Sequence, residues 1–177
     1  VGLLDVPSDG QYFLEEVEIT RLPDKEQARI RNSHFGFIFQ SFNLFSELSA
    51  IENVMLPMGY AGMRRSDRRK RAAELLEQVS LSERMYHLPT MMSGGEQQRV
   101  AIARALAVDP LIILADEPTG NLDSKSGAEI LNLFDELHAQ GKPKGKGEPT
   151  GKGKPEGKGR RNNFYILRVS QRVRVGG

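Results

Sequence analysis

The run Met92–Ser124, MSGGEQQRVAIARALAVDPLIILADEPTGNLDS, constrains the fold more than any other part of the sequence. It begins with Ser93 and two glycines and continues with apolar residues at helical spacing, which predicts a helix capped by Ser93. Asp109-Pro110 predicts the end of that helix. Residues 111–115 are continuously apolar, as expected for a parallel strand buried on both faces. The run therefore predicts a helix that leads into a buried strand of an α/β sheet.

The predicted helix start and the predicted strand end both carry groups suited to a phosphate ligand. Gly94 and Gly95 leave backbone N–H groups and the positive end of the helix dipole free to meet an anion. Asp116 and Glu117 stand at the carboxyl end of the strand, where open α/β sheets bind ligands. A pair of carboxylates there suits a magnesium ion and a water to be activated. A Gly-Asn turn follows and leads to Asp123.

A simpler interpretation is available for the helix start. Ser93-x-x-Glu96 is also an ordinary capping box, which needs no ligand. We favour the functional interpretation, because a capping box, a helix, an acid-tipped strand and a Gly-Asn turn are not expected to coincide by chance at this spacing.

These residues resemble the signature motif, Walker B strand and D-loop of ATP-binding cassette (ABC) transporter ATPases, in the form found in the lipoprotein-releasing and macrolide-export type. FGFIFQ at 35–40 resembles the Q-loop region. The resemblance implies a P-loop NTPase-like α/β fold, with a RecA-like core and a helical subdomain. It implies a partial ABC ATPase domain over 1–140, with the Q-loop segment, helical subdomain and signature helix in 41–107 and the Walker B strand, D-loop and next helix in 108–140.

The resemblance implies ATP and Mg²⁺ as cofactors and assigns a role to each matching residue. Gln40 would contact magnesium and the attacking water and sense the membrane partner. Asp116 would orient magnesium through water, and Glu117 would polarise the attacking water as the catalytic base.

Family members act as head-to-tail dimers that hold two nucleotides between them. By this resemblance Ser93, Gly94, Gly95 and Glu96 would contact the γ-phosphate of ATP held by the opposite subunit. Asp123 would communicate across the dimer. The expected partners are a second ATPase subunit, either a copy of this chain or an intact ATPase, and transmembrane permease subunits, which would meet residues 41–63. The expected location is the cytoplasmic, inner face of the cell membrane.

Two family features do not occur in the sequence. No G-x-x-x-x-G-K-[ST] P-loop is present, and the residues from Val1 resemble the family segment that follows the P-loop helix, so we expect Walker A to lie just before Val1. No Thr-His pair with the switch histidine follows Gly141. We therefore expect the isolated chain to be weak or inactive as an ATPase. The alternative is a non-catalytic fragment or interaction module derived from such an ATPase.

The C-terminal segment 141–177 differs in composition from the rest. Its first part, GKPKGKGEPTGKGKPEGKG, has too few apolar residues to stabilise an ordered core. Residues 141–177 hold eleven Lys and Arg against two Glu, a net charge of +9, whereas residues 1–140 have a net charge of −7. We expect a disordered, solvated basic tail, in which Phe164–Val169 could form a short strand. With only Phe164 and Tyr165 available for stacking, no nucleic-acid partner is expected.

Periodicity predicts further helices, and composition limits the class of protein. Helices are expected over 23–32, over 66–79, and over 124–140, where Ile130, Leu131, Phe134 and Leu137 would form the packing face. The sequence contains no cysteine, which excludes disulfides. Its wholly apolar runs are far shorter than the roughly 20 residues of a membrane span, so we expect any membrane link to pass through a partner.

Overall fold

The computed structural model describes residues 13–14, 17–18, 22–140 and 164–168. The helices are α1 (Asp24–His34), α2 (Ala50–Tyr60), α3 (Arg65–Gln78), α4 (Gly94–Leu106) and α5 (Ser124–Gln140), with short 3-10 helices at Ser82–Arg84 and Pro89–Met91. The strands are β1 (Phe13–Leu14), β2 (Val17–Glu18), β3 (Phe35–Ile38), β4 (Ile112–Asp116) and β5 (Phe164–Arg168).

The central sheet has the strand order β3-β4-β5. β3 and β4 run parallel, with Phe35 opposite Ile112 and Ile38 opposite Ala115. β5 pairs with the other edge of β4 in the antiparallel direction, and β1 and β2 form a separate two-stranded antiparallel sheet. The prediction of a parallel β4 is therefore correct on the β3 side. Ile112, Ile113 and Ala115 of β4 are buried, and Leu114 is partly buried.

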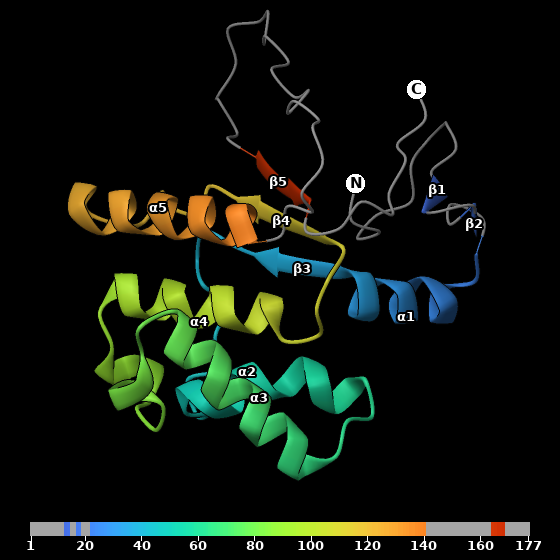
Figure 1. Cartoon of the computed structure of the whole chain (residues 1–177), viewed down its shortest axis with the longest axis horizontal. Coiled ribbons are helices and arrows are strands. Elements are labelled where there is room, and N and C mark those ends of the chain that lie inside the picture. Colours follow the sequence, from blue (N-terminus) through green and yellow to red (C-terminus); the bar gives the residue numbers. More distant parts are fainter. Residues whose placement is uncertain (1–12, 15–16, 19–21, 141–163, 169–177) are drawn as a thin grey trace, which may run out of the picture.

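Helix α4 lies between the sheet and the pair formed by α2 and α3 (Figure 1). The apolar residues at helical spacing that predicted this helix are buried at Val100, Ala103 and, just beyond its end, Ala107, whereas Leu106 is partly buried. The helix is also buried at Ala101 and Ile102, so neighbouring elements cover most of its circumference. Small residues on α4 permit this close packing. A Cβ atom added at Gly36 of β3 would stand only 2.6 Å from the backbone oxygen of Ala105.

Helices α2 and α4 each begin with a capping box. In α2, the Glu52 carboxylate accepts hydrogen bonds from the backbone N–H and the hydroxyl of Ser49 at 2.9 and 2.5 Å. In α4, Glu96 accepts from the backbone N–H of Ser93 at 2.8 Å, and the Ser93 hydroxyl accepts from the N–H of Glu96 at 3.3 Å. The predicted Ser93 cap is thus confirmed.

The remaining elements agree with the sequence in outline and differ in detail. α3, expected over 66–79, buries the apolar side chains Ala72, Leu75 and Leu76. In α5 the predicted face is wrong at Leu131, which is 38% exposed, whereas Leu133 is buried. The strand β5, at Phe164–Arg168, lies within the segment that was expected to be disordered. The sequence analysis had allowed for a short strand at Phe164–Val169. The Gly- and Lys-rich residues 141–163 lie outside the described residues.

Across the part of the chain that the structure describes, no helix combines the length and the apolar character needed to span a bilayer.

Candidate functional site

The sheet brings three of the predicted residues to one edge. Because β3 and β4 run parallel and Ile38 pairs with Ala115, the chain leaves both strands on the same side. Gln40 follows β3 by two residues, and Glu117 follows β4 directly. Asp116, the last residue of β4, is exposed, and Glu117 is partly buried. The strand tips therefore present two carboxylates and one amide side chain at the edge where open α/β sheets bind ligands.

The turn after β4 holds Glu117 in an uncommon backbone conformation. Glu117 has a φ of 42°, in the left-handed region that L residues with side chains rarely adopt. Its carbonyl oxygen accepts a hydrogen bond from the N–H of Gly120 at 2.9 Å, and the N–H of Leu122 donates to the carbonyl of Thr119 at 3.1 Å. Backbone strain of this kind persists where the surrounding structure fixes the conformation, and it is frequent at functional sites.

Gln40 and Asn121 bind each other across a sequence separation of 81 residues. The Gln40 Nε2 donates to Asn121 Oδ1 at 3.3 Å, and the Asn121 Nδ2 donates to the backbone oxygen of Gln40 at 3.0 Å. Gly120 permits this approach, since a Cβ atom there would stand 2.6 Å from Gln40 Nε2. No role was predicted for the side chain of Asn121. Only its place in the Gly-Asn turn could have drawn attention to it.

The start of α4 meets the same turn. A Cβ atom at Gly94 would lie 3.3 Å from Leu122, and one at Gly95 would lie 3.3 Å from Ser126. The two glycines therefore have a packing role besides the predicted ligand role. The capping box uses the N–H groups of Ser93 and Glu96. The N–H groups of Gly94 and Gly95 belong to the first helical turn, which has no intrahelical acceptor for them, so they remain available to an anion.

Glu96 makes contacts of its own within the chain. The hydrogen bond from the Ser93 backbone N–H is the main cause that lowers the pKa of Glu96, with smaller contributions from the Ser93 hydroxyl and from nearby Arg84 and His87. The Arg84 Nε lies 3.4 Å from Glu96 Oε1. These contacts offset the negative charge of Glu96 beside the two free glycine amides. Direct contact of Glu96 with a nucleotide stays a prediction.

Asp123 caps α5. Its Oδ1 accepts from the N–H groups of Lys125 and Ser126, both at 3.0 Å, and its Oδ2 accepts from the Ser126 hydroxyl at 2.7 Å. The Ser126 hydroxyl, followed by the Ser126 backbone N–H, holds the pKa of Asp123 below its ordinary value. The exposed carboxylate thus stabilises a helix start, whatever it does across a dimer.

We expect the Asp123 cap to weaken in acid. A carboxyl with a depressed folded-state pKa contributes stability above its unfolded pKa, near 3.8, and that contribution is lost as the pH falls through the folded-state pKa. In thermal melts between pH 7 and pH 3, the difference in melting temperature between the unsubstituted chain and Asp123→Asn should therefore shrink. The same series in a Ser126→Ala background should show a smaller difference at pH 7. A difference that is constant across the pH range would contradict this assignment.

A comparison with known protein families matches residues 3–120 to the ABC transporter family. The chain belongs to the ABC transporter family.

Individual relatives support the same family assignment. The chain is 56% identical over 142 residues to an uncharacterized ABC transporter ATP-binding protein of Thermotoga maritima, a match that covers 80% of the chain and 61% of that relative. It is also 56% identical over 142 residues to the macrolide export ATP-binding/permease protein MacB of Chlorobaculum tepidum, a match that covers 80% of the chain and 22% of MacB. The chain therefore spans only part of the length of these relatives.

Two solved structures share the fold. A dimeric structure of MJ0796, a bacterial ABC transporter cassette, matches with a TM-score of 0.69 and 46% identity over 78% of this chain and 62% of that one. A dimeric post-hydrolysis structure of MJ0796 bound to ADP and Pi matches with a TM-score of 0.68 and 46% identity, over 77% of this chain and 60% of that one. The ABC ATPase fold expected from the sequence is confirmed.

The family assignment implies a magnesium ion, and the residues at the strand tips fit one. Mg²⁺ prefers oxygen ligands and keeps several of its waters, so it needs few protein groups. Asp116 offers an exposed carboxylate. The bond to Asn121 uses the Nε2 of Gln40, which leaves the amide oxygen of Gln40 outside that pair. No group of three or more His, Cys, Asp or Glu side chains suited to a metal occurs among the described residues, so binding would depend on water and phosphate oxygens.

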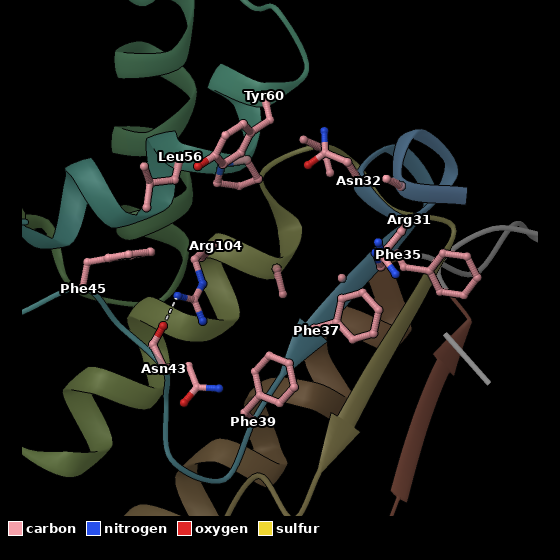
Figure 2. Close-up of a pocket in the computed structure, with 15 residues that line it drawn as sticks. Arg31, Asn32, Phe35, Phe37, Phe39, Asn43, Phe45, Leu56, Tyr60 and Arg104 are labelled. Atoms are coloured by element: carbon pink, nitrogen blue, oxygen red, sulfur yellow. Dashed lines mark hydrogen bonds between the residues drawn. The ribbon is translucent and has the colours of Figure 1, made fainter. Parts of the chain in front are cut away.

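A surface hollow of about 370 Å³ lies beside the Q-loop. Phe39, Phe45, Leu56 and Tyr60 contribute to its lining, and Figure 2 shows Phe35, Phe37 and Phe39 in a row along one side. The rings of Phe37 and Phe39 stack with centroids 6.1 Å apart. Phe45 is 55% exposed and Tyr60 is 80% exposed, so the rim offers a large apolar surface to a partner.

Arg104, at the end of α4, joins this hollow to the Q-loop. Its guanidinium donates to the backbone oxygen of Asn43 (Figure 2) and, at 2.9 Å, to the backbone oxygen of Phe42. Phe42 and Asn43 have φ values of 60° and 50°, so the hydrogen bonds hold a strained stretch of backbone. Burial lowers the pKa of Arg104. The sequence analysis missed Arg104, because an arginine in a helical pattern carries no signal of a contact 61 residues away.

Proposed function

We propose that this chain is an ATP-binding subunit of an ABC transporter, which couples MgATP hydrolysis to export or to translocation of a lipoprotein, drug or peptide through membrane partners. The observation that carries the proposal is the joint position of three elements. The tips of β3 and β4 and the start of α4 all meet the turn 118–121. These elements offer the two kinds of group that the proposal needs: carboxylates at the tip of β4 for magnesium and water, and free amides at the start of α4 for the phosphate of a second nucleotide.

The proposed arrangement needs two subunits. In the dimer, the start of α4 faces the γ-phosphate of a nucleotide that the opposite subunit holds, and Asp116, Glu117 and Gln40 act on the nucleotide of their own subunit. No P-loop motif occurs in the 177 residues, and such a motif is the usual phosphate cradle of these ATPases. We propose that the 177-residue chain alone hydrolyses little ATP, and that an intact ATPase can supply the P-loop of one composite site. The dimers of MJ0796 are consistent with such a pairing.

The proposed membrane partner is a permease subunit that docks at the hollow beside the Q-loop. Apolar, exposed Phe45 and Tyr60 would receive an apolar segment of that partner. Arg104 would link the docked segment to the Q-loop backbone. The ATP-binding/permease organisation of MacB proteins supports a permease as the partner. Such a partner would hold the chain at the cytoplasmic face of the cell membrane.

The composite site can be tested with one variant and a matched control. We expect the chain to form a mixed dimer with the Thermotoga maritima relative in the presence of ATP, measured by size-exclusion chromatography. Ser93→Asp should weaken this dimer by about tenfold or more, because aspartate still caps the helix but adds a negative charge facing the phosphate. Ser49→Asp changes the other capping box, at the start of α2, and should leave the mixed dimer intact.

The outcomes separate the two candidate functions. Loss of the mixed dimer with Ser93→Asp alone supports the composite ATP site. If no mixed dimer forms with any chain, the alternative of a non-catalytic fragment or interaction module derived from an ABC ATPase is favoured.

A further inference from the structure

The signature helix α4 contains a fully buried polar side chain that the proposed mechanism does not use. Gln98 has 0% of its surface exposed and lies one turn after the start of the helix. Its Nε2 donates a hydrogen bond to the backbone oxygen of Pro118 at 2.7 Å. The bond joins α4 to the turn that follows the Walker B strand, across 20 residues of sequence.

The orientation of the Gln98 amide follows from its partner. A backbone oxygen only accepts hydrogen bonds, so the NH₂ group must face Pro118 and the Oε1 must point the other way. That Oε1 is buried and has no hydrogen-bond partner within the part of the chain that the structure describes. A buried, unpaired oxygen is unfavourable, whereas an apolar side chain of similar length would fill the same space without it. Stability alone therefore gives little reason for a glutamine at this position.

The bond acts next to a residue in an uncommon backbone conformation. Pro118 directly follows Glu117, whose φ of 42° is strained. The Gly120 N–H binds the carbonyl of Glu117 from the far side of the turn, at 2.9 Å. Gln98 binds the next carbonyl along the chain from the side of α4. These two hydrogen bonds hold the two peptide groups on either side of Pro118, and so restrict the backbone on the carboxyl side of Glu117.

We infer that Gln98 is a positioning residue for Glu117. It ties the turn after the Walker B strand to the signature helix of the same subunit, so that a shift of α4 moves the backbone that carries Glu117. This inference rests on the proposed function, in which the start of α4 serves one nucleotide of the dimer and Glu117 serves the other. Gln98 then links the two nucleotide sites through a single side chain.

Amide hydrogen exchange on the 177-residue chain tests the link. We expect Gln98→Met to speed exchange of the Gly120 and Leu122 amides by about tenfold, because the turn loses its anchor on α4. The midpoint of urea unfolding should change little, since the substitution leaves the Pro118 carbonyl without its donor but also removes the unpaired Oε1 of Gln98. The matched control is Gln97→Met, which removes the neighbouring amide, a donor to the Met92 carbonyl at 3.1 Å. It should leave exchange of Gly120 and Leu122 unchanged.

A second measurement uses the unsubstituted chain and so does not depend on how the variants fold. In NMR spectra, the side-chain amide protons of Gln98 should exchange with water at least about tenfold more slowly than those of Gln97, which is only partly buried. Equal exchange for the two side chains, or faster turn exchange in both variants, would overturn the inference. The exchange measurements need no nucleotide. Failure of the ATP-dependent mixed dimer would therefore count against the proposed function, without changing what the exchange rates say about Gln98.

Discussion

Glu117→Gln should lower the rate of ATP hydrolysis by about 10² to 10⁴-fold, the range expected for loss of a general base. The variant keeps the shape of the side chain but removes the carboxylate that would polarise the attacking water. Glu117 follows β4 directly, and the hydrogen bond from Gly120 holds its carbonyl. The effect should therefore appear in the rate of the chemical step, and the affinity for MgATP should stay within about threefold of the unsubstituted protein.

The measurement requires a chain that carries a P-loop. We suggest a chimera in which the N-terminal segment of the Thermotoga maritima relative precedes Val1, assayed for steady-state turnover and for nucleotide binding. Glu136→Gln is the matched control, because Glu136 is an exposed carboxylate on α5. A Glu117→Gln chimera that keeps more than about a third of the control rate would show that another group activates the water.

Gly36→Ala should destabilise the fold by about 2 to 3 kcal/mol, near the upper end of the range for overpacking a core. The added Cβ would lie 2.6 Å from the Ala105 backbone oxygen and 3.2 Å from its Cβ. The obstruction is backbone, so no side-chain rotation relieves it, and β3 and α4 must separate. Since β3 leads into the Q-loop, the same separation should disturb Gln40. Equilibrium unfolding in urea measures the loss directly.

Gly127→Ala is the same chemical change in a different setting. Gly127 lies within α5, where a Cβ atom would meet only ordinary contacts, 3.6 and 3.8 Å from Thr119. Alanine is the better helix former, so this variant should gain about 0.5 to 1 kcal/mol. Equal losses in both variants would show that the close contact between β3 and α4 is not the cause of the Gly36 effect.

Features that depend on neighbouring residues were predictable from the sequence alone. The Ser93 cap, α4 and β4 arise from short-range hydrogen bonding and from apolar spacing, which the linear order of residues contains. The placement of Asp116 and Glu117 at a strand end follows from the same pattern. The family was also predictable from the sequence, because the spacing between the helix, the strand and the turn is itself part of the family pattern.

The tertiary structure decided the contacts between distant segments. Gln40 meets Asn121 across 81 residues and Arg104 meets Asn43 across 61, and neither contact leaves a periodic trace in the sequence. The α5 face was predicted wrongly at Leu131 because helical periodicity shows only that an apolar stripe exists. Packing against the neighbouring elements decides which residues at the border of that stripe are buried. Likewise, the antiparallel place of β5 beside β4 depends on which strand edge is open.

The sequence by itself thus determined which chemical groups the site offers and on which elements they stand, since local hydrogen bonding and apolar spacing act between near neighbours. Only the tertiary structure decided how those groups are held. Gln98 donates a hydrogen bond to Pro118, the glycines of α4 pack against residues of and after the turn, and Gly36 lies in close contact with Ala105. The physical reason is that these are contacts between surfaces, which exist only after the sheet and α4 have packed together.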